Sequence, residues 1–242
     1  MPDLNAITPE TSPAFNLLTE HPNGEEYQEY LEVVAEFYEL NIDMGVTVEH
    51  VQKKQGTFVL TTNKGEYHCQ FLIWAAGEYQ YPSTSGFEGS EHCRHTATVE
   101  KYGDLEGDDF LIIGGYESGI DAAYHLAKND KQVRVFDING PWESESSDPS
   151  VALSTFSFER MRHEKFEQNV ELHANTVVTL VNHVNDSYQI TTGDGRTFSS
   201  KVQPLFAGGF DGSHKFVSHL FNTRDDGFPE INDNDESTTV PG

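Results

Sequence analysis

The residues best suited to chemistry lie in one stretch of the 242-residue chain, between Phe110 and Asp137. An apolar run from Phe110 enters the glycine-rich turn Gly114-Gly-Tyr-Glu-Ser-Gly119, an amphipathic run follows, and a second apolar run ends at Asp137. This order of strand, tight turn, helix and strand is typical of a dinucleotide site. Backbone N–H groups of the turn and the positive end of the helix face the pyrophosphate, and the acid after the second strand accepts hydrogen bonds from a ribose. The stretch therefore predicts an NAD(P)H site made by Gly114, Gly115, Glu117, Ser118, Gly119 and Asp137.

The glycine spacing of the turn keeps the pattern G-x-G-x-x-G in part. Gly114 and Gly119 are in place, but Tyr116 stands where the middle glycine belongs. Asp137 follows the turn by roughly 20 residues, which is the expected spacing. Two alternatives stay open. The same βαβ unit can serve only to pack a sheet, and Ser118 can be a helix N-cap that needs no ligand.

The acid at the end of the second strand predicts which nucleotide is preferred. A carboxylate there repels the 2′-phosphate of NADPH. No basic pair follows Asp137 in residues 138–150, so we expect a preference for NADH. The alternative is that Asp137 is a solvated loop acid, and Arg134 lies in the same region.

The rest of the sequence repeats one order of elements: a helix, a β-meander, and an apolar run that ends in glycine. The first copy has a helix at 25–40, strands at 45–52, 57–62 and 67–75, and the apolar run Phe71–Gly77. The second copy has a helix at 154–168, strands at 176–182, 187–192 and 197–203, and the apolar run 204–210. Because Phe71–Gly77 is apolar on both faces, we expect it to be a central strand of a covered sheet. Residues 78–106 contain several helix and strand breakers and predict an irregular connector.

The composition excludes several classes of partner. Forty acidic and fifteen basic residues give a formal charge of −25, which repels nucleic acid and anionic membranes. We interpret that charge as a solvated acidic surface suited to high salt. No apolar run approaches the roughly 18 residues that span a bilayer. We therefore expect a cytoplasmic protein with a small-molecule substrate, and a homodimer stays open.

Cysteine and histidine usage predicts no metal site. The two cysteines, Cys69 and Cys93, form no C-x-x-C pair, which disfavours a dithiol centre and fits a reducing compartment. His92, Cys93 and His95 lie close together, but the breakers around them predict a surface loop.

Three motifs together resemble a known family. They are Trp74-Ala-Ala-Gly77, the turn from Gly114 to Gly119, and Ala207-Gly-Gly-Phe210. The chain is similar to the flavoproteins with two dinucleotide-binding domains, and most to the flavin-containing monooxygenase-like and bacillithiol-disulfide-reductase-like NAD(P)/FAD-dependent oxidoreductases. In those proteins an apolar strand ends in Ala-Thr-Gly at each crossing between the domains. Here Ala75-Ala-Gly77 and Ala207-Gly-Gly209 stand at those places, each with the threonine replaced.

The resemblance implies an α/β fold with two Rossmann-like FAD/NAD(P)-binding domains of the disulfide-reductase type, the first of them incomplete. It implies a partial FAD domain at 1–106, an NAD(P)H domain at 107–211, and a return to the FAD domain with a polar tail at 212–242. Gly209 joins the NAD(P)H site, while Val48, Ala76 and Gly77 lie against FAD. The implied function passes hydride from nicotinamide to flavin and electrons onward to oxygen or to a small organic or disulfide acceptor.

The chain departs from the family at both ends. Family members begin with a strand, glycine turn and helix that hold the FAD pyrophosphate, but residues 1–45 contain only Gly24 and Gly45. No closing strand and helix are evident before Gly242. We expect an internal fragment or reduced form of such a flavoprotein, in which FAD binding by this chain alone is in doubt. The alternative function is a truncated, non-catalytic NAD(H)-binding module, and the sequence names no catalytic residue.

Overall fold

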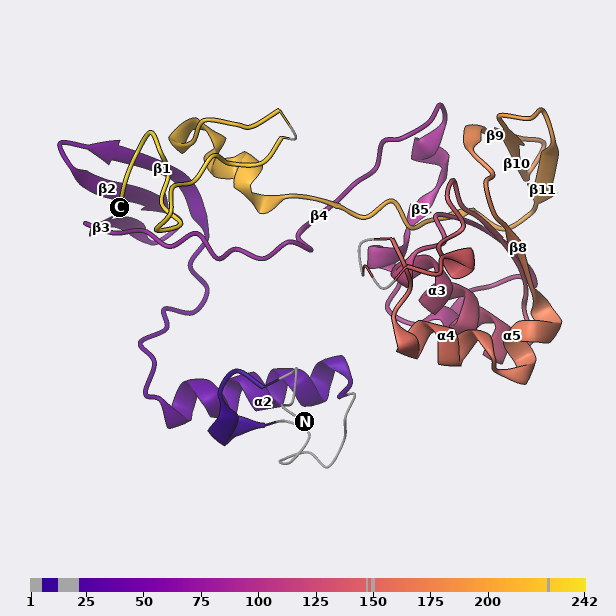
Figure 1. Cartoon of the computed structure of the whole chain (residues 1–242), viewed down its shortest axis with the longest axis horizontal. Coiled ribbons are helices and arrows are strands. Elements are labelled where there is room, and N and C mark those ends of the chain that lie inside the picture. The colour runs from indigo at the N-terminus through magenta and orange to yellow at the C-terminus, as the bar shows by residue number, and fades with distance from the viewer. Residues whose placement is uncertain (1–5, 13–21, 147, 149–150, 226) are drawn as a thin grey trace. The chain divides into compact units, whose positions relative to one another are not determined.

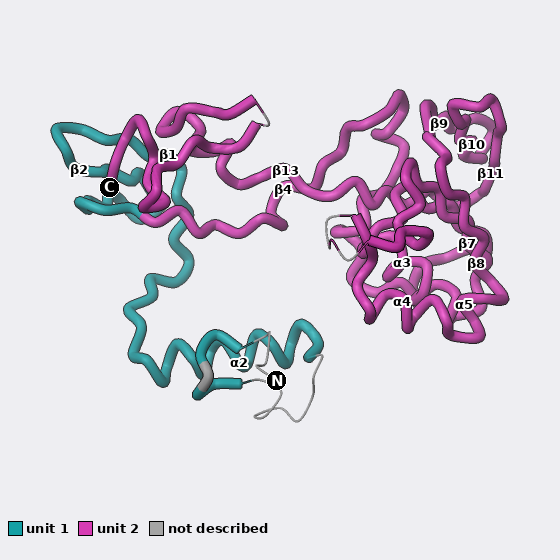
Figure 2. The backbone as a smooth tube through the Cα atoms, viewed as in Figure 1, with its two compact units in different colours: residues 1–72 teal, residues 73–242 magenta. Residues whose placement is uncertain are grey.

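A computed structural model describes residues 6–12, 22–146, 148, 151–225 and 227–242. The chain divides into two compact units, Met1–Leu72 and Ile73–Gly242, which Figure 2 colours separately. The predicted domain boundaries after residues 106 and 211 are a different division and stay predictions. Each unit is described by itself.

Unit 1 contains the first predicted helix, α2 (Gly24–Phe37). A capping box starts it: Asn23 Oδ1 accepts a hydrogen bond from Glu26 N at 3.0 Å, and Glu26 Oε2 accepts one from Asn23 N at 2.8 Å. The short 3₁₀ helix η1 (Pro9–Thr11) is tied to α2, because the hydroxyls of Thr11 and Tyr30 lie 3.0 Å apart. The helix is confirmed, with its end three residues earlier than expected.

Unit 1 also contains the first meander, an antiparallel sheet of β1 (Val48–Lys54), β2 (Thr57–Thr62) and β3 (Gly65–Cys69). The expected extension of the third strand to Ala75 is wrong. Residues 71–77 form no strand, and Phe71 and Ile73 are 73% and 89% exposed. A strand that is apolar on both faces needs a paired neighbour and covering layers, and no described strand pairs with this run.

The centre of unit 2 is a five-stranded parallel sheet of order β5-β12-β6-β7-β8, of which Figure 1 labels β5 and β8. Its strands are β5 (Arg94–His95), β12 (Leu205–Phe206), β6 (Asp109–Ile113), β7 (Gln132–Phe136) and β8 (Val170–His173). The predicted strand–turn–helix–strand unit is therefore present as β6, α3 and β7.

Both faces of this sheet are covered. Phe110 and Ile112 of β6 pack with α3 (Glu117–Lys128), α4 (Thr155–Met161) and α5 (Glu164–Asn169). Leu111 and Ile113 pack with the second meander, β9 (Val178–Val184), β10 (Ser187–Thr192) and β11 (Thr197–Ser200). Alternate residues of one strand thus serve two cores, as expected for a parallel strand between two layers.

Two expected elements differ in unit 2. The single helix at 154–168 is two helices, because the His163 ring caps α5 by accepting a hydrogen bond from Lys165 N at 3.2 Å. The connector at 78–106 is not irregular throughout. It contains β4 (Tyr81–Pro82), which pairs with β13 (Phe210–Asp211), and it contains β5 within the main sheet.

Candidate functional site

The candidate site lies at the carboxyl edge of the parallel sheet, between β6 and β12. From β6 the chain continues to β7 and β8 on one side, while β12 and β5 lie on the other. Such a switch in strand order opens a crevice at the carboxyl ends of the strands, where ligands bind in open α/β sheets. Here the glycine turn after Ile113 meets Ala207, whose N–H donates to the carbonyl of Ile113 at 2.8 Å.

Three glycines of the turn are required by close packing. A Cβ on Gly119 would lie 1.9 Å from the carbonyl oxygen of Gly114, so the first turn of α3 presses on the strand end. Gly114 has a φ of +96°, and its Cβ would lie 2.5 Å from the carbonyl oxygen of Ala207. A Cβ on Gly115 would lie 2.3 Å from Cζ3 of Trp142. The turn is therefore packed tightly on Ala207 and Trp142 and leads directly into the N-terminus of α3, an arrangement that suits a nucleotide pyrophosphate.

The helix begins earlier than predicted. Tyr116 is the N-cap of α3, without a side-chain capping bond, and its carbonyl accepts a hydrogen bond from Gly119 N at 3.0 Å. Ser118 is the second residue of the helix, so its predicted role as N-cap is wrong. Tyr116 has a φ of −79°, which any residue can adopt, so the backbone conformation at this position does not itself require the middle glycine of the pattern.

Asp137 is engaged by backbone groups of its own neighbourhood. Its Oδ1 accepts hydrogen bonds from Asn139 N at 2.8 Å and Gly140 N at 2.7 Å, and its Oδ2 accepts one from Gly115 N at 2.8 Å. The carboxylate therefore ties the loop after β7 to the glycine turn. The sequence identified the acid but not these donors.

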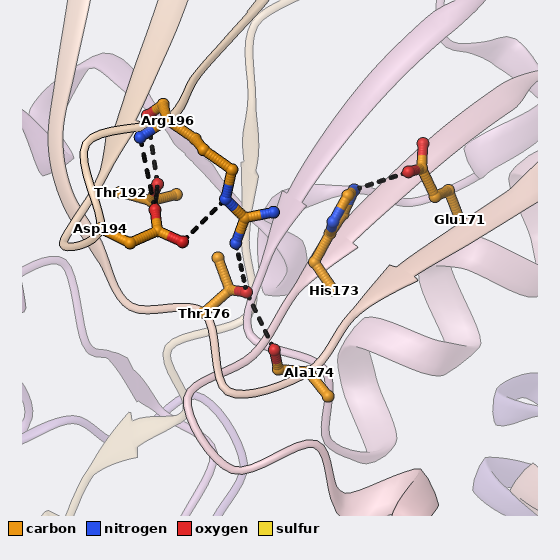
Figure 3. A network of polar contacts seen from close by, with 7 residues as sticks. All are labelled: Glu171, His173, Ala174, Thr176, Thr192, Asp194 and Arg196. Atoms are coloured by element: carbon orange, nitrogen blue, oxygen red, sulfur yellow. Dashed lines mark hydrogen bonds and ion pairs between the residues drawn. The ribbon is translucent and has the colours of Figure 1, made fainter.

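A polar network from the second meander supports this loop (Figure 3). Thr176 N donates to the carbonyl of Asp137 at 2.8 Å. The Thr176 hydroxyl accepts from Arg196 at 3.2 Å and donates to the carbonyl of Ala174 at 2.9 Å. Arg196 in turn pairs with Asp194 at 2.8 Å. The β10–β11 turn thus holds the segment on which Asp137 depends.

His173, at the end of β8, is a half-buried titratable ring in this network. It stacks on Phe136 with ring centroids 4.6 Å apart, and its Nε2 lies 3.3 Å from Oε1 of Glu171 without forming a hydrogen bond (Figure 3). Burial lowers the pKa of His173, and the Glu171 charge opposes that shift. The charges of Arg196 and Arg134 add to the lowering of this pKa.

Glu117, predicted to bind cofactor, makes contacts within the protein. Its Oε1 accepts a hydrogen bond from Ser154 N at 2.5 Å, and its Oε2 accepts from the hydroxyls of Ser154 at 3.0 Å and Ser157 at 2.6 Å. These serines form the first turn of α4, so Glu117 ties α4 to the start of α3. The sequence offered no signal for this pairing, because the partners lie 37 and 40 residues away.

A cavity of about 330 Å³ opens beside the start of α3. Asp121 lies in its wall, paired with Arg160 of α4 and 3.5 Å from Nε2 of His125. Burial acts to raise the pKa of Asp121, but His125 and Arg160 outweigh it and the pKa is lowered. The cavity is lined by Thr96, Ala97, Tyr102, Glu117, Ser118, Asp121, Arg160 and Phe210.

A second cavity of about 470 Å³ shares Tyr102 and Asp121 with the first. Burial, followed by the charge of Asp121, raises the pKa of Tyr102 to about 12, so its hydroxyl stays protonated. Tyr102 is stacked on His125 with ring centroids 6.1 Å apart. Tyr102 and Asp121 thus line both cavities.

Gly209 lies near the same edge of the sheet and has a φ of +73°. Its carbonyl oxygen lies 2.9 Å from Nε2 of His95 and accepts a hydrogen bond from Ser83 N at 3.0 Å. His95 is buried within β5, so the expected surface loop at 92–95 is wrong for this residue. The breakers around it concealed a two-residue strand that pairs with β12. Within the described residues no cluster of His, Cys, Asp and Glu could hold a metal ion.

The residues expected to lie against FAD belong to different units. Val48 begins β1 in unit 1, while Ala76 and Gly77 lie in unit 2, where Gly77 has a φ of +81°. Residues 1–5 and 13–21 of the expected FAD region lie outside the described residues. A helix N-terminus is the group that would hold the FAD pyrophosphate. In residues 6–12 and 22–44 the one α-helix is α2, and its first turn carries the acidic residues Glu25 and Glu26. That terminus repels a phosphate, so the described part of unit 1 does not fit the FAD pyrophosphate.

The sequence was compared with models of protein families. The model of the pyridine nucleotide-disulphide oxidoreductases matches residues 1–242. The chain belongs to that family. A match over the whole chain confirms the resemblance, and the α/β fold with its parallel sheet is the predicted one.

Curated relatives are similar over parts of the chain. One is "Uncharacterized oxidoreductase CzcO-like" of Geobacillus kaustophilus, 30% identical over 117 residues, which are 47% of this chain and 33% of the relative. Another is bacilliredoxin reductase Bdr of Bacillus subtilis, 30% identical over 82 residues, or 34% of this chain and 25% of the relative. These alignments span about a quarter to a third of the curated relatives' own length.

Solved structures show the same fold over a longer stretch. The bacillithiol disulfide reductase Bdr (YpdA) of Staphylococcus aureus has a TM-score of 0.72 at 23% identity, covering 89% of this chain and 65% of the reductase. A flavin-containing monooxygenase of Stenotrophomonas maltophilia has a TM-score of 0.67 at 14% identity, covering 92% of this chain and 68% of the monooxygenase. In the part of the chain that the structure describes, no helix is long and apolar enough to cross a membrane.

Proposed function

We propose that unit 2 binds NAD(P)H at the edge between β6 and β12, within an oxidoreductase that also uses flavin. The observation that carries the proposal is the glycine turn, which stands at the switch in strand order and is closed by the N-terminus of α3. Membership of the pyridine nucleotide-disulphide oxidoreductases supports it. Bound nicotinamide supplies a hydride in that chemistry.

The residues of the chain have distinct parts in this proposal. Gly114, Gly115 and Gly119 keep the backbone close enough for a pyrophosphate, and Ser118 lies at the positive end of α3. The cavity beside the turn takes one end of the nucleotide. Gly209 lies in the segment between β12 and β13 and bounds the same edge of the sheet.

We further propose that NADH binds more tightly than NADPH. The charge of Asp137 stays beside the glycine turn, since Gly115 N donates to it at 2.8 Å. A 2′-phosphate brought to this loop meets that carboxylate without a basic side chain from residues 138–146 to compensate. The acceptor of the electrons is oxygen or a small organic or disulfide compound, with no nucleic acid or membrane partner.

The experiment is a calorimetric titration of the purified full chain with NADH and with NADPH. We expect saturable binding of both, with NADH the tighter ligand. No binding of either nucleotide overturns the proposed function, and equal or reversed affinities overturn the preference.

One observation favours a second function, a non-catalytic NAD(H)-binding module. The described part of unit 1 offers no fit for the FAD pyrophosphate, because its helix N-terminus is occupied by Glu26. Purification with added FAD separates the two: stoichiometric flavin and NADH oxidation support the oxidoreductase, and nucleotide binding without flavin supports the module.

A further inference from the structure

Trp142 lies against the glycine turn. A Cβ on Gly115 would be 2.3 Å from Cζ3 and 2.9 Å from Cη2 of the indole, so ring and turn are in direct contact. Trp142 is half-buried and also packs against the core cluster that contains Ile112. The indole is therefore held beside the turn, with part of its surface accessible.

The loop that carries Trp142 is fixed at its start. Asp137 bonds the backbone N–H groups of Asn139 and Gly140, and Gly140 is the N-cap of the 3₁₀ helix η5 (Pro141–Glu143). Gly140 packs closely on the next element, because a Cβ there would lie 2.6 Å from Cβ of Ala174. The position of the indole is thus set by Asp137 and by two tight contacts, that of Gly140 with Ala174 and that of Gly115 with the ring itself.

Asp137 has little capacity left for a ribose. A carboxylate offers about four acceptor sites. Both sites of Oδ1 and one of Oδ2 are taken by Asn139, Gly140 and Gly115. One site remains, which serves a single hydroxyl, so another group must hold the adenosine half of a nucleotide.

We propose that Trp142 is that positioning residue: the adenine of the dinucleotide stacks on its indole, and Asp137 fixes the loop that presents it. The inference rests on the proposed function. A pyrophosphate on the turn places the adenosine ribose at the end of the second strand, so the base arrives at the segment that follows Asp137. Indole stacks on any purine because each base has a π-face.

The chain offers a direct optical test, since Trp74 and Trp142 are its two tryptophans. In the full-length variant Trp74→Phe, the emission of Trp142 is recorded during titration with ADP-ribose and with nicotinamide mononucleotide. We expect saturable quenching by ADP-ribose, which carries the adenine, and none by the mononucleotide.

The matched variants are Trp142→Ala and Trp142→Phe, with Trp74→Phe as control. Loss of the stacking surface lowers the affinity for ADP-ribose about tenfold in Trp142→Ala, whereas Trp142→Phe keeps most of it. Thermal unfolding confirms that each variant is folded, and Trp142→Phe remains decisive if Trp142→Ala fails to fold. If ADP-ribose binds normally but does not quench the emission of Trp142, the stacking inference is wrong and the proposed function stands. No binding of ADP-ribose or NADH by the unmodified chain overturns the proposed function as well.

Discussion

Gly119 is the position where one methyl group tests the site most directly. In Gly119→Ala, the new Cβ would lie 1.9 Å from the carbonyl oxygen and 2.9 Å from the carbonyl carbon of Gly114. Ordinary contact begins at 3.4 Å, so α3 and the end of β6 must separate by about 1.5 Å. Both sides of this contact are backbone, and neither can rotate away as a flexible side chain would.

The magnitude follows from two opposing effects. Overpacking of this kind costs up to about 3 kcal/mol. Replacing glycine by alanine within a helix recovers about 1 kcal/mol. We therefore expect a net loss of about 2 kcal/mol, which lowers the melting temperature of a unit of this size by roughly 4–8 °C. The displaced turn moves its N–H groups from the pyrophosphate, so the affinity for NADH falls by at least about tenfold.

The assays are thermal unfolding and calorimetric titration of Gly119→Ala beside Gly193→Ala. Gly193 is a matched control in unit 2, because its nearest neighbour to an added Cβ is 3.7 Å away and its φ is not positive. We expect the control to melt and bind as the unmodified chain does. If Gly119→Ala also behaves normally, the close approach of α3 to Gly114 is not a property of the protein in solution.

Three further outcomes follow from the structure. Asp137→Asn should narrow the ratio of NADPH to NADH dissociation constants, measured by titration, because the amide carries no charge; an unchanged ratio contradicts the electrostatic argument. Glu117→Gln should lower the free energy of unfolding by roughly 1–2 kcal/mol in denaturant, since charged hydrogen bonds to α4 are lost, while the exposed Glu159→Gln should not. The pKa of His173 is lowered on folding, so the unfolded chain binds a proton more readily, and the free energy of unfolding should fall as the pH drops below about 6.5. The variant His173→Phe should reduce this pH dependence, and an unchanged pH dependence in the variant would refute the assignment to His173.

Local sequence patterns predicted the β6–α3–β7 segment of unit 2 well. The run from Phe110 to Asp137 predicted β6, α3 and β7 because each signal, apolar strand, glycine turn and amphipathic helix, lies within a few residues of the next. The strand at 187–192 was predicted to the residue for the same reason. Such elements depend on periodicity and turn chemistry, which a sequence displays directly.

The contacts that define the site depend on partners far apart in the chain. Trp142 touches Gly115 because the parallel sheet brings the ends of β6 and β7 together. Glu117 holds Ser154 and Ser157 because α4 packs on α3. The donors to Asp137 were concealed for a different reason. Two of them belong to its own loop, whose conformation the sequence did not specify.

The two apolar runs that end in glycine show how the same pattern leads to different structures. Leu205 and Phe206 of the second run lie between β5 and β6, paired on both sides, and are 1% and 8% exposed. The first run, Phe71–Gly77, has no strand partner among the described residues. Its Phe71 and Ile73 side chains stay exposed, while Trp74 is half-buried against Phe216. An apolar run therefore predicts that a segment can be buried, while the neighbours available in the fold decide whether it is. At the second run those neighbours are β5 and β6, and they are the strands that place Ala207 beside Gly114 and so create the edge on which the nucleotide proposal depends.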